Sequence, residues 1–224
     1  MTDRNPLIVA LDRSSTSEAV ELATVLGPKA GMLKVGFELF WAEGPDGVRA
    51  VARHGRVFVD SKLHDIPNTV EHAAANITRL GAAMFNVHAL GGDAMMRAAL
   101  KGAEKAADEL REPRPIVIAV TVLSSHSGEE LASSASLAYE AREAGLDGVV
   151  VSGDDVSLVR EACGEDFLLV VPGIRPSGSP NGDQRRVLTP RAALEAGADW
   201  IVVGRPITEA PDPASAAEAI LAEC

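Results

Sequence analysis

The chain has 224 residues, a formal net charge of −11 and 46% hydrophobic residues. This length suits one large domain, and the hydrophobic fraction is ample for a core. The strong negative charge argues against nucleic acid and against an anionic membrane as partners, because both need a basic surface. A small phosphorylated ligand is not excluded, because one arginine and a few backbone N–H groups can hold a phosphate.

Nothing in the sequence predicts export or membrane insertion. No apolar run approaches the roughly 18 residues of a membrane span, and the start, MTDRNPLIVALD, lacks the long apolar segment of a secretory signal. The two cysteines, Cys163 and Cys224, have no metal-ligand spacing and fit a reducing compartment. We therefore expect a cytoplasmic protein without a disulfide.

Eight short apolar runs recur along the chain, each bounded by polar residues or glycine. They are hydrophobic throughout rather than alternating, as strands buried on both faces of a sheet are. Their valine and isoleucine content favours strand over helix. The runs are residues 7–12, 32–37, 57–60, 84–88, 116–120, 148–152, 167–171 and 200–204.

Segments rich in alanine, glutamate and leucine separate these runs and predict helices. Strands that alternate with helices indicate a parallel sheet, and eight strands close most naturally into a (β/α)8 TIM barrel. A doubly wound open sheet is the alternative. We expect residues 1–224 to form a single barrel domain, with loops at 44–47 (Gly-Pro-Asp-Gly) and at 175–187. The clearest predicted helices are residues 17–26, 68–80, 94–110 and 136–145.

The most informative stretch is VFVDSKLHDIPNT, residues 57–69. It begins as a hydrophobic strand, and residues two apart on a strand point to the same side, so Asp60 and Lys62 share a face. Asp65 follows just past the strand end, where the chain can fold back. Lysine and aspartate are almost never fully buried unless paired. The stretch is therefore either a structural ion-pair cluster or a proton donor that nearby carboxylates keep charged.

Polar side chains also stand at or just after the ends of other predicted strands, where a barrel carries its catalytic groups. Each has an ordinary alternative. Asp12 could cap a helix that begins near Ser17, and Lys34 could extend into solvent. His88 could be a hydrogen-bonded core residue, and Ser124 could satisfy a turn. Together on one rim they are better explained as one site, whose members would be Asp12, Lys34, Asp60, Lys62, His88, Ser124, Arg175 and Arg205.

The last two predicted strands lead into a candidate phosphate site, as is usual in this barrel. Gly204 lets the backbone approach a ligand closely, and the forked guanidinium of Arg205 suits phosphate. After the seventh strand, PGIRP at 172–176 opens a long polar loop, a candidate lid whose Arg175 and Gln184 reach a ligand on closing. The alternatives are a surface arginine at a glycine turn and a disordered loop.

With these residues placed, the whole chain resembles the orotidine 5′-phosphate decarboxylase family of the bacterial type. DSKLHDIPNT at 60–69 is similar to the family signature, and PGIRP at 172–176, DQ at 183–184 and VVGRPI at 202–207 match its later motifs in order. Ser61 stands where the family often has an apolar residue. Ser124 stands where it often has threonine, which leaves a hydroxyl in place.

The resemblance implies decarboxylation of orotidine 5′-monophosphate to uridine 5′-monophosphate in de novo pyrimidine synthesis, without a metal or an organic cofactor. Lys62 would protonate carbon 6 of the ring, and Asp60 would lie against the substrate carboxylate. Lys34 and Asp65 would complete an alternating chain of charges, with Asp65 contributed by the other subunit of a homodimer. The substrate-binding positions that the resemblance implies are Asp12, Lys34, Ile66, Thr69, Ser124, Pro172, Arg175, Gln184, Gly204 and Arg205.

The resemblance also gives roles to these positions. Asp12 and Thr69 would address the ribose, and Ser124 would read the pyrimidine. Gln184 would close the lid. The phosphate would be held by Arg175, Gly204 and Arg205.

Two other functions are compatible with parts of this sequence pattern. A sister enzyme on the same barrel, a hexulose-phosphate synthase or keto-gulonate-phosphate decarboxylase, resembles this site through a D-x-K-x-x-D core and uses magnesium. The continuation Ile66-Pro67-Asn68-Thr69 and the long loop with Gln184 favour the nucleotide enzyme. A non-catalytic nucleotide-phosphate binding protein is the other alternative. Binding alone would not need a lysine among carboxylates, which argues against it.

Overall fold

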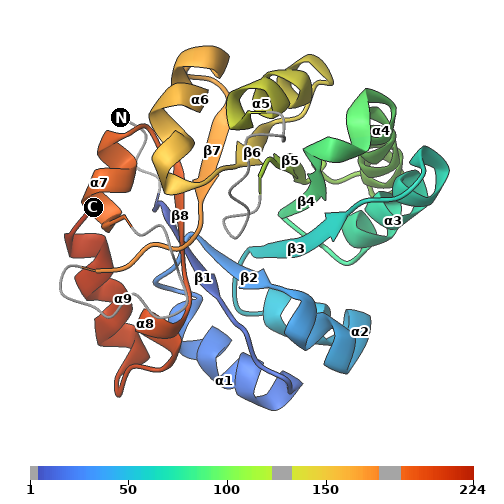
Figure 1. Ribbon diagram of the computed structural model, residues 1–224. Coiled ribbons are helices and arrows are strands. Elements are labelled where there is room, and N and C mark those ends of the chain that lie inside the picture. Colours follow the sequence, from blue (N-terminus) through green and yellow to red (C-terminus); the bar gives the residue numbers. More distant parts are fainter. Residues whose placement is uncertain (1–4, 123–132, 177–187) are drawn as a thin grey trace.

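A computed structural model describes residues 5–122, 133–176 and 188–224. Eight parallel strands form a closed barrel in chain order, and helices surround it (Figure 1). The predicted (β/α)8 barrel is confirmed, and the alternative of an open doubly wound sheet is wrong. In the described part of the chain, no helix is long and apolar enough to cross a membrane.

Each strand lies at a predicted apolar run. Five strands are one or two residues shorter than their runs, and the third continues three residues further. Each strand pairs in parallel with its neighbours, and the first closes the barrel against the eighth. The strands are β1 Leu7–Ala10, β2 Met32–Val35, β3 Val57–Leu63, β4 Met84–His88, β5 Ile116–Val120, β6 Gly148–Val150, β7 Leu168–Val171 and β8 Trp200–Val203.

The four clearest predicted helices correspond to α1, α3, α4 and α5. The N-cap of α1 is Ser15, whose side chain accepts a hydrogen bond from the backbone N–H of Glu18, so the interpretation of Asp12 as a helix cap is wrong. The helices are α1 Thr16–Leu26, α2 Phe37–Ala52, α3 Pro67–Arg79, α4 Gly92–Leu110, α5 Ser134–Glu143, α6 Val156–Cys163, α7 Pro190–Glu195, α8 Arg205–Thr208 and α9 Pro213–Ala222, with 3-10 turns η1 Ala89–Gly91 and η2 Gly153–Asp155.

The loop predicted at 44–47 is wrong, because α2 runs through these residues. Only Gly44 leaves the helical conformation, with φ 63° and ψ −153°, and this produces a kink. A positive φ favours glycine, and Pro45 suits the first turn of the second half because that turn does not need its N–H. Gly44 and Pro45 therefore mark a kink within α2 rather than a loop between two elements.

Two layers of hydrophobic side chains build the core. One lies between the strands and the helices, and the other fills the barrel interior. Along β2, β3 and β4, the interior layer is followed two residues later by a polar side chain that shares its face. The interior residues are Ile8, Ala10, Met32, Phe58, Met84, Ile118, Val170, Trp200 and Val202.

Two ion pairs tie strand ends together at the opposite, amino-terminal end of the barrel. Arg114 binds both carboxylate oxygens of Asp147 at 2.6 and 2.8 Å, and Asp147 also accepts from the backbone N–H of Val117 at 2.7 Å. Arg160 binds Asp199 at 2.7 Å, and Asp199 accepts from the N–H of Leu169 at 2.8 Å. Their role in holding the strand ends explains these two pairs without any ligand.

Helix α4 lies close against α3, the helix that follows the stretch at 57–69. Gly102 permits this approach, because a Cβ at this position would lie 2.1 Å from the carbonyl oxygen of Glu71. Since that neighbour is backbone, it cannot rotate away as a side chain could. Gly102 therefore helps to fix α3 relative to the barrel.

We expect Gly102→Ala to lower the free energy of unfolding by about 1–3 kcal/mol, because the added methyl group overpacks the α3–α4 contact. The measurement is urea unfolding followed by circular dichroism. Lys105→Ala is the matched control, since it places alanine at an exposed position of the same helix. Equal stability of both variants would contradict the proposed close approach.

Candidate active site

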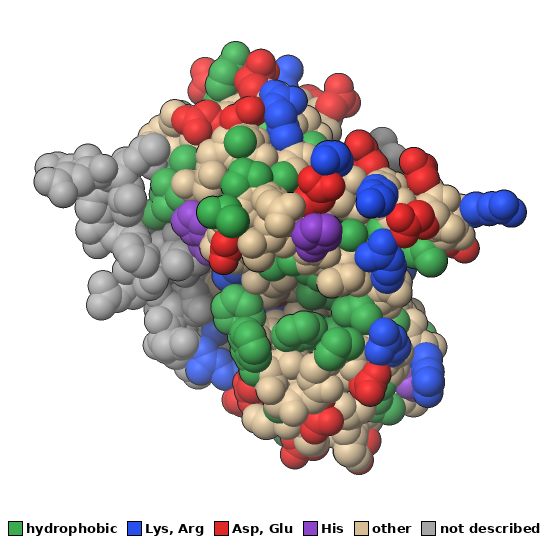
Figure 2. Space-filling view, turned by 90° about the vertical axis from the view of Figure 1, so that its right-hand side faces the viewer, with side chains coloured by type: hydrophobic (Ala, Val, Ile, Leu, Met, Phe, Trp, Pro, Cys, Tyr) green, Lys and Arg blue, Asp and Glu red, His purple; other side chains and the backbone are tan. Residues whose placement is uncertain are grey.

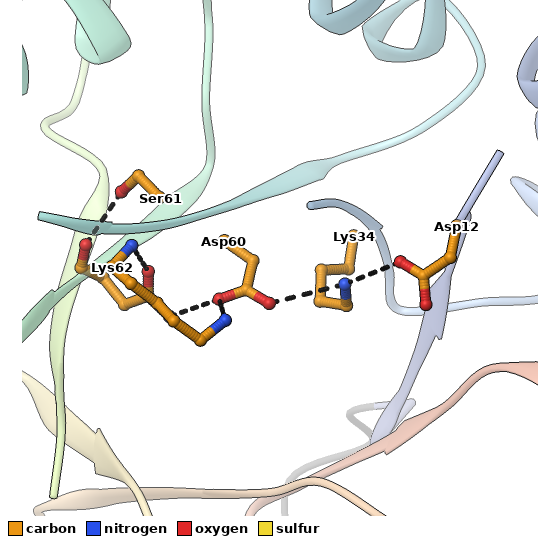
Figure 3. A network of polar contacts seen from close by, with 6 residues as sticks. Asp12, Lys34, Asp60, Ser61 and Lys62 are labelled. Atoms are coloured by element: carbon orange, nitrogen blue, oxygen red, sulfur yellow. Dashed lines mark hydrogen bonds and ion pairs between the residues drawn. The ribbon is translucent and has the colours of Figure 1, made fainter. Parts of the chain in front are cut away.

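An alternating row of acidic and basic side chains lies at the carboxyl ends of β1, β2 and β3 (Figure 3). Lys34 Nζ lies 3.1 Å from Asp12 Oδ1 and 3.4 Å from Asp60 Oδ2. Lys62 Nζ lies 2.5 Å from Asp60 Oδ1. The structure therefore brings together four of the predicted site residues, and two acids and two bases give the row a formal charge of zero.

Burial and charge act in opposite directions on the two central members of the row. Burial opposes a charge on Lys34, which is 9% exposed, but the carboxylates of Asp60 and Asp12 outweigh it and raise the pKa of Lys34. Burial likewise opposes a charge on Asp60, but Lys34, Lys62 and a hydrogen bond from Asn86 outweigh it and lower the pKa of Asp60. Both side chains are therefore ionised at neutral pH.

The end of β3 departs from a regular strand. Its pairing with β4 shifts register between Val59 and Leu63, and Lys62 has a positive φ of 44°. The side chains of Asp60 and Lys62 still meet, as strand periodicity predicts. A left-handed backbone at a residue other than glycine costs about 1–2 kcal/mol, and such residues concentrate at functional sites.

Asn86 is a site residue that the sequence interpretation missed. Its side chain lies on β4, is fully buried, and donates to Asp60 Oδ1 at 2.7 Å while accepting from the backbone N–H of Lys62 at 2.7 Å. One signal could have revealed it, because asparagine interrupts a hydrophobic run two positions before His88 and so shares its face.

A narrow cavity of about 180 Å³ opens above the row. The described part of its wall includes Lys34, Asp60 and Lys62 on one side and apolar side chains from β5 to β8 on the other. Ser152, another residue that sequence analysis missed, also lines it. Its hydroxyl oxygen is buried and has no hydrogen-bond partner among the described residues, as expected of a group that binds a ligand.

A second cavity of about 550 Å³ continues from the first, and both are lined by Lys34, Pro172 and Val202. It is the more polar of the two and contains Arg175 and Arg205. Arg175 is buried, and burial together with the charge of Arg205 lowers its pKa. Two guanidinium groups that repel each other are stabilised by an anion between them, so this end suits a phosphate.

Gly204 also lines the second cavity. Three other predicted residues lie apart from the row. Asp65, Ile66 and Thr69 are exposed around the start of α3, and no ion pair joins Asp65 to Lys62 within the described residues. The carboxylate of Asp65 accepts from the backbone N–H of Ile66 at 2.7 Å. Ser124 and Gln184 fall outside the described residues.

His88 is half-buried at the end of β4, with its ring 5.4 Å from that of His64. Burial, His64 and Lys62 lower the pKa of His88, and Asp60 opposes them only in part. The imidazole is therefore neutral at pH 7. Because the ring of His88 is neutral, Lys62 and not His88 supplies the positive charge next to Asp60 Oδ1.

We expect His88 to make the protein less stable as the pH falls from about 7 to about 5. The unfolded chain takes up a proton on this histidine near pH 6.5, whereas the lowered pKa of the folded state resists it, so the free energy of unfolding decreases through this range. Urea unfolding at several pH values should show a smaller decrease for His88→Gln.

The control for this series is His72→Gln, which removes an exposed histidine of α3 and measures the effect of a histidine deletion alone. An unchanged slope in His88→Gln would contradict the assignment.

Known proteins are similar to this one in sequence and in fold. A model of the family described as "Orotidine 5'-phosphate decarboxylase / HUMPS family" matches residues 5–220. A protein of Moorella thermoacetica named orotidine 5′-phosphate decarboxylase is 51% identical, and the match covers 100% of this chain and 93% of that protein. A protein of Nitratidesulfovibrio vulgaris with the same name is 49% identical over 97% of this chain and 96% of its own length.

Solved structures agree with these sequence matches. The crystal structure of orotidine 5′-phosphate decarboxylase from Lactobacillus acidophilus superposes with a TM-score of 0.85 at 39% identity, covering 98% of each chain. The match with the family model spans nearly the whole chain, and the two named relatives are about half identical to it over nearly its full length. The chain therefore belongs to the orotidine 5′-phosphate decarboxylase / HUMPS family.

Proposed function

We propose that this protein is a carboxy-lyase that converts orotidine 5′-monophosphate to uridine 5′-monophosphate, with Lys62 as the acid that protonates carbon 6. The family and the named relatives support the decarboxylation. The observation that supports the role of Lys62 is its ion pair with Asp60 at the wall of the narrow cavity. We extend the proposal to one (β/α)8 domain spanning residues 1–224 and acting in the cytoplasm.

The two connected cavities suggest how the substrate lies. The narrow, largely apolar cavity suits the pyrimidine ring, and the polar cavity with Arg175 and Arg205 suits the 5′-phosphate. Asp12 lines the polar cavity close to the shared wall, at a position that suits the ribose hydroxyls. In this proposal Ser124 contacts the ring, and Gln184 closes over the phosphate end.

The chemistry places specific demands on Lys62. When the bond between carbon 6 and the carboxylate breaks, carbon dioxide leaves and the electron pair stays on carbon 6. This pair lies in the plane of the ring, so the ring π-system cannot delocalise it. The ammonium of Lys62 stabilises the charge where it develops and then transfers a proton to carbon 6, leaving a neutral amine.

Asp60 contributes repulsion that disappears during the reaction. It would face the substrate carboxylate, and two unit charges about 4 Å apart repel by roughly 4 kcal/mol at an effective dielectric constant near 20. Enzymes lower barriers by roughly 8–23 kcal/mol, so repulsion alone is too small. Binding of the remote phosphate must supply part of the free energy that holds Asp60 and the substrate together.

The same family name also covers the HUMPS activity, so the magnesium-dependent sister reaction is the second candidate. The contacts of Asp60 favour the metal-free reaction. Its Oδ1 accepts from Lys62 and from Asn86, and its Oδ2 faces Lys34 at 3.4 Å, so a divalent cation would have to displace an ammonium group. We therefore predict that the decarboxylation does not require a metal ion.

We expect purified protein in excess chelator to consume orotidine 5′-monophosphate, seen as a change in ultraviolet absorbance. Lys62→Ala should lose at least about 1,000-fold in kcat, because it removes both the proton and the charge at the reacting carbon. Binding of uridine 5′-monophosphate, measured by calorimetry, should stay measurable in this variant. Near-normal turnover by Lys62→Ala would refute its role, and loss of wild-type activity on chelation would favour the sister reaction.

We further propose that the protein works as a homodimer in which Asp65 enters the site of the other subunit. Asp65 is exposed and makes no ion pair with the described part of its own chain. An apolar groove of about 590 Å³ lies between α2 and α3, and its wall includes Leu63, two residues before Asp65. Figure 2 faces the side of the molecule formed by α2, α3 and α4, and hydrophobic side chains gather there around a hollow.

The groove and the catalytic row share a wall, which supports an interface at this place. Asp60 lines both the groove and the narrow cavity, and Phe37 contacts Lys62 with its ring centroid 5.4 Å from Nζ. Phe37 is 49% exposed, Trp41 79% and Ile66 66%. Large apolar side chains at this exposure are typical of a protein–protein contact.

Complementation between two inactive variants tests the shared site. We expect Lys62→Ala and Asp65→Ala each to be inactive alone, and a mixture after subunit exchange to recover about one quarter of wild-type activity, because half of the dimers are mixed and each holds one intact site. Differently tagged copies that purify together verify exchange. If mixed dimers form and remain inactive, Asp65 does not act across an interface.

A further inference from the structure

We propose that Asn86 is a positioning residue for the decarboxylation, which holds Asp60 and Lys62 in their reactive arrangement; this inference rests on the proposed function. Asn86 belongs to β4, the strand next to β3, and its side chain is fully buried. Among the described residues, it joins the carboxylate of Asp60 to the proton donor Lys62 through one planar amide group.

The amide uses its two ends for different partners. Nδ2 donates to Asp60 Oδ1 at 2.7 Å, the same oxygen that accepts from Lys62 Nζ at 2.5 Å. Oδ1 accepts from the backbone N–H of Lys62 at 2.7 Å. Because an amide is rigid and planar, these bonds fix the distance between the carboxylate of Asp60 and the main chain that carries the ammonium.

The contact to the main chain of Lys62 matters because that main chain is strained. Lys62 has φ 44°, and the regular pairing between β3 and β4 is interrupted from Val59 to Leu63. At this interruption the N–H of Lys62 bonds the side chain of Asn86 rather than a backbone carbonyl. The amide oxygen thus replaces a missing ladder bond and keeps Lys62 in the conformation that turns its Nζ toward Asp60.

The contact to Asp60 matters for charge. A donor from Asn86 occupies one position on Oδ1, so the carboxylate cannot rotate freely between its neighbours. The hydrogen bond also helps to lower the pKa of Asp60, in addition to the effects of Lys34 and Lys62. Only a side chain that donates at one end and accepts at the other makes both contacts, and asparagine is the residue of this length that does so at every pH.

The test uses Asn86→Leu and Asn86→Asp. Leucine has the same number and branching of side-chain heavy atoms as asparagine and removes both bonds. We expect kcat to fall roughly 10- to 100-fold, as for loss of hydrogen bonds to charged groups. Binding of uridine 5′-monophosphate should change less than about threefold, because Asn86 acts on the reacting groups rather than on the phosphate. A role in stability alone would reduce the folded fraction without lowering kcat per folded site.

Asn86→Asp adds a readout that packing cannot produce. The carboxylate that this substitution introduces accepts from Lys62 when it is ionised but repels Asp60, whereas its protonated form donates as the amide does. The kcat of this variant relative to wild type should therefore rise as the pH is lowered from about 8 to about 5. If Asn86→Leu does not fold, the pH dependence of Asn86→Asp still tests the positioning role of Asn86.

Ser61→Ala is the matched control, since the hydroxyl of Ser61 donates to the backbone carbonyl of Asn86 at 2.8 Å and not to its amide. It should keep kcat within about twofold of wild type. A folded Asn86→Leu with wild-type kcat, or a ratio for Asn86→Asp that stays near one at every pH, would overturn the inference. An inactive wild-type protein would instead refute the proposed function.

Discussion

A single carboxylate between two ammonium groups determines how the rest of the site is built. Asp60 faces Lys34 on one oxygen and Lys62 on the other, at the boundary between the apolar barrel interior and the narrow cavity. Moving an isolated ion into such a place costs several kcal/mol. The alternation with Asp12 keeps the row neutral, so the buried charges of Lys34 and Asp60 are compensated by their neighbours rather than by water.

The other end of the barrel shows what a purely structural ion pair looks like in the same protein. Asp147 and Asp199 each bind an arginine and, with a carboxylate oxygen, the N–H of a neighbouring strand, so their bonds join the chain to itself. The row of Asp12, Lys34, Asp60 and Lys62 instead reaches a cavity, and both lysines line space that a ligand can fill. Both ends of the barrel contain ion pairs. They differ in that the charged groups at one end bind only the protein, whereas those at the other end also face a cavity.

Much of this arrangement follows from the sequence, because strand periodicity is a strong local rule. Eight apolar runs predict the barrel, and the two-residue repeat predicts that Asp60 and Lys62 meet. Asn86 was missed because its importance depends on a register shift in the neighbouring strand, which a local pattern does not encode. Gly44 was misread because glycine and proline signal both a loop and a kink within a helix.

The left-handed backbone at Lys62 bears on how this position can vary. Glycine would adopt the same conformation at no steric cost, and the main chain alone would favour it. Glycine carries no ammonium, so under the role proposed for Lys62 selection for stability and selection for activity oppose each other at this one residue. The site thus retains a conformation that a chain optimised only to fold would discard.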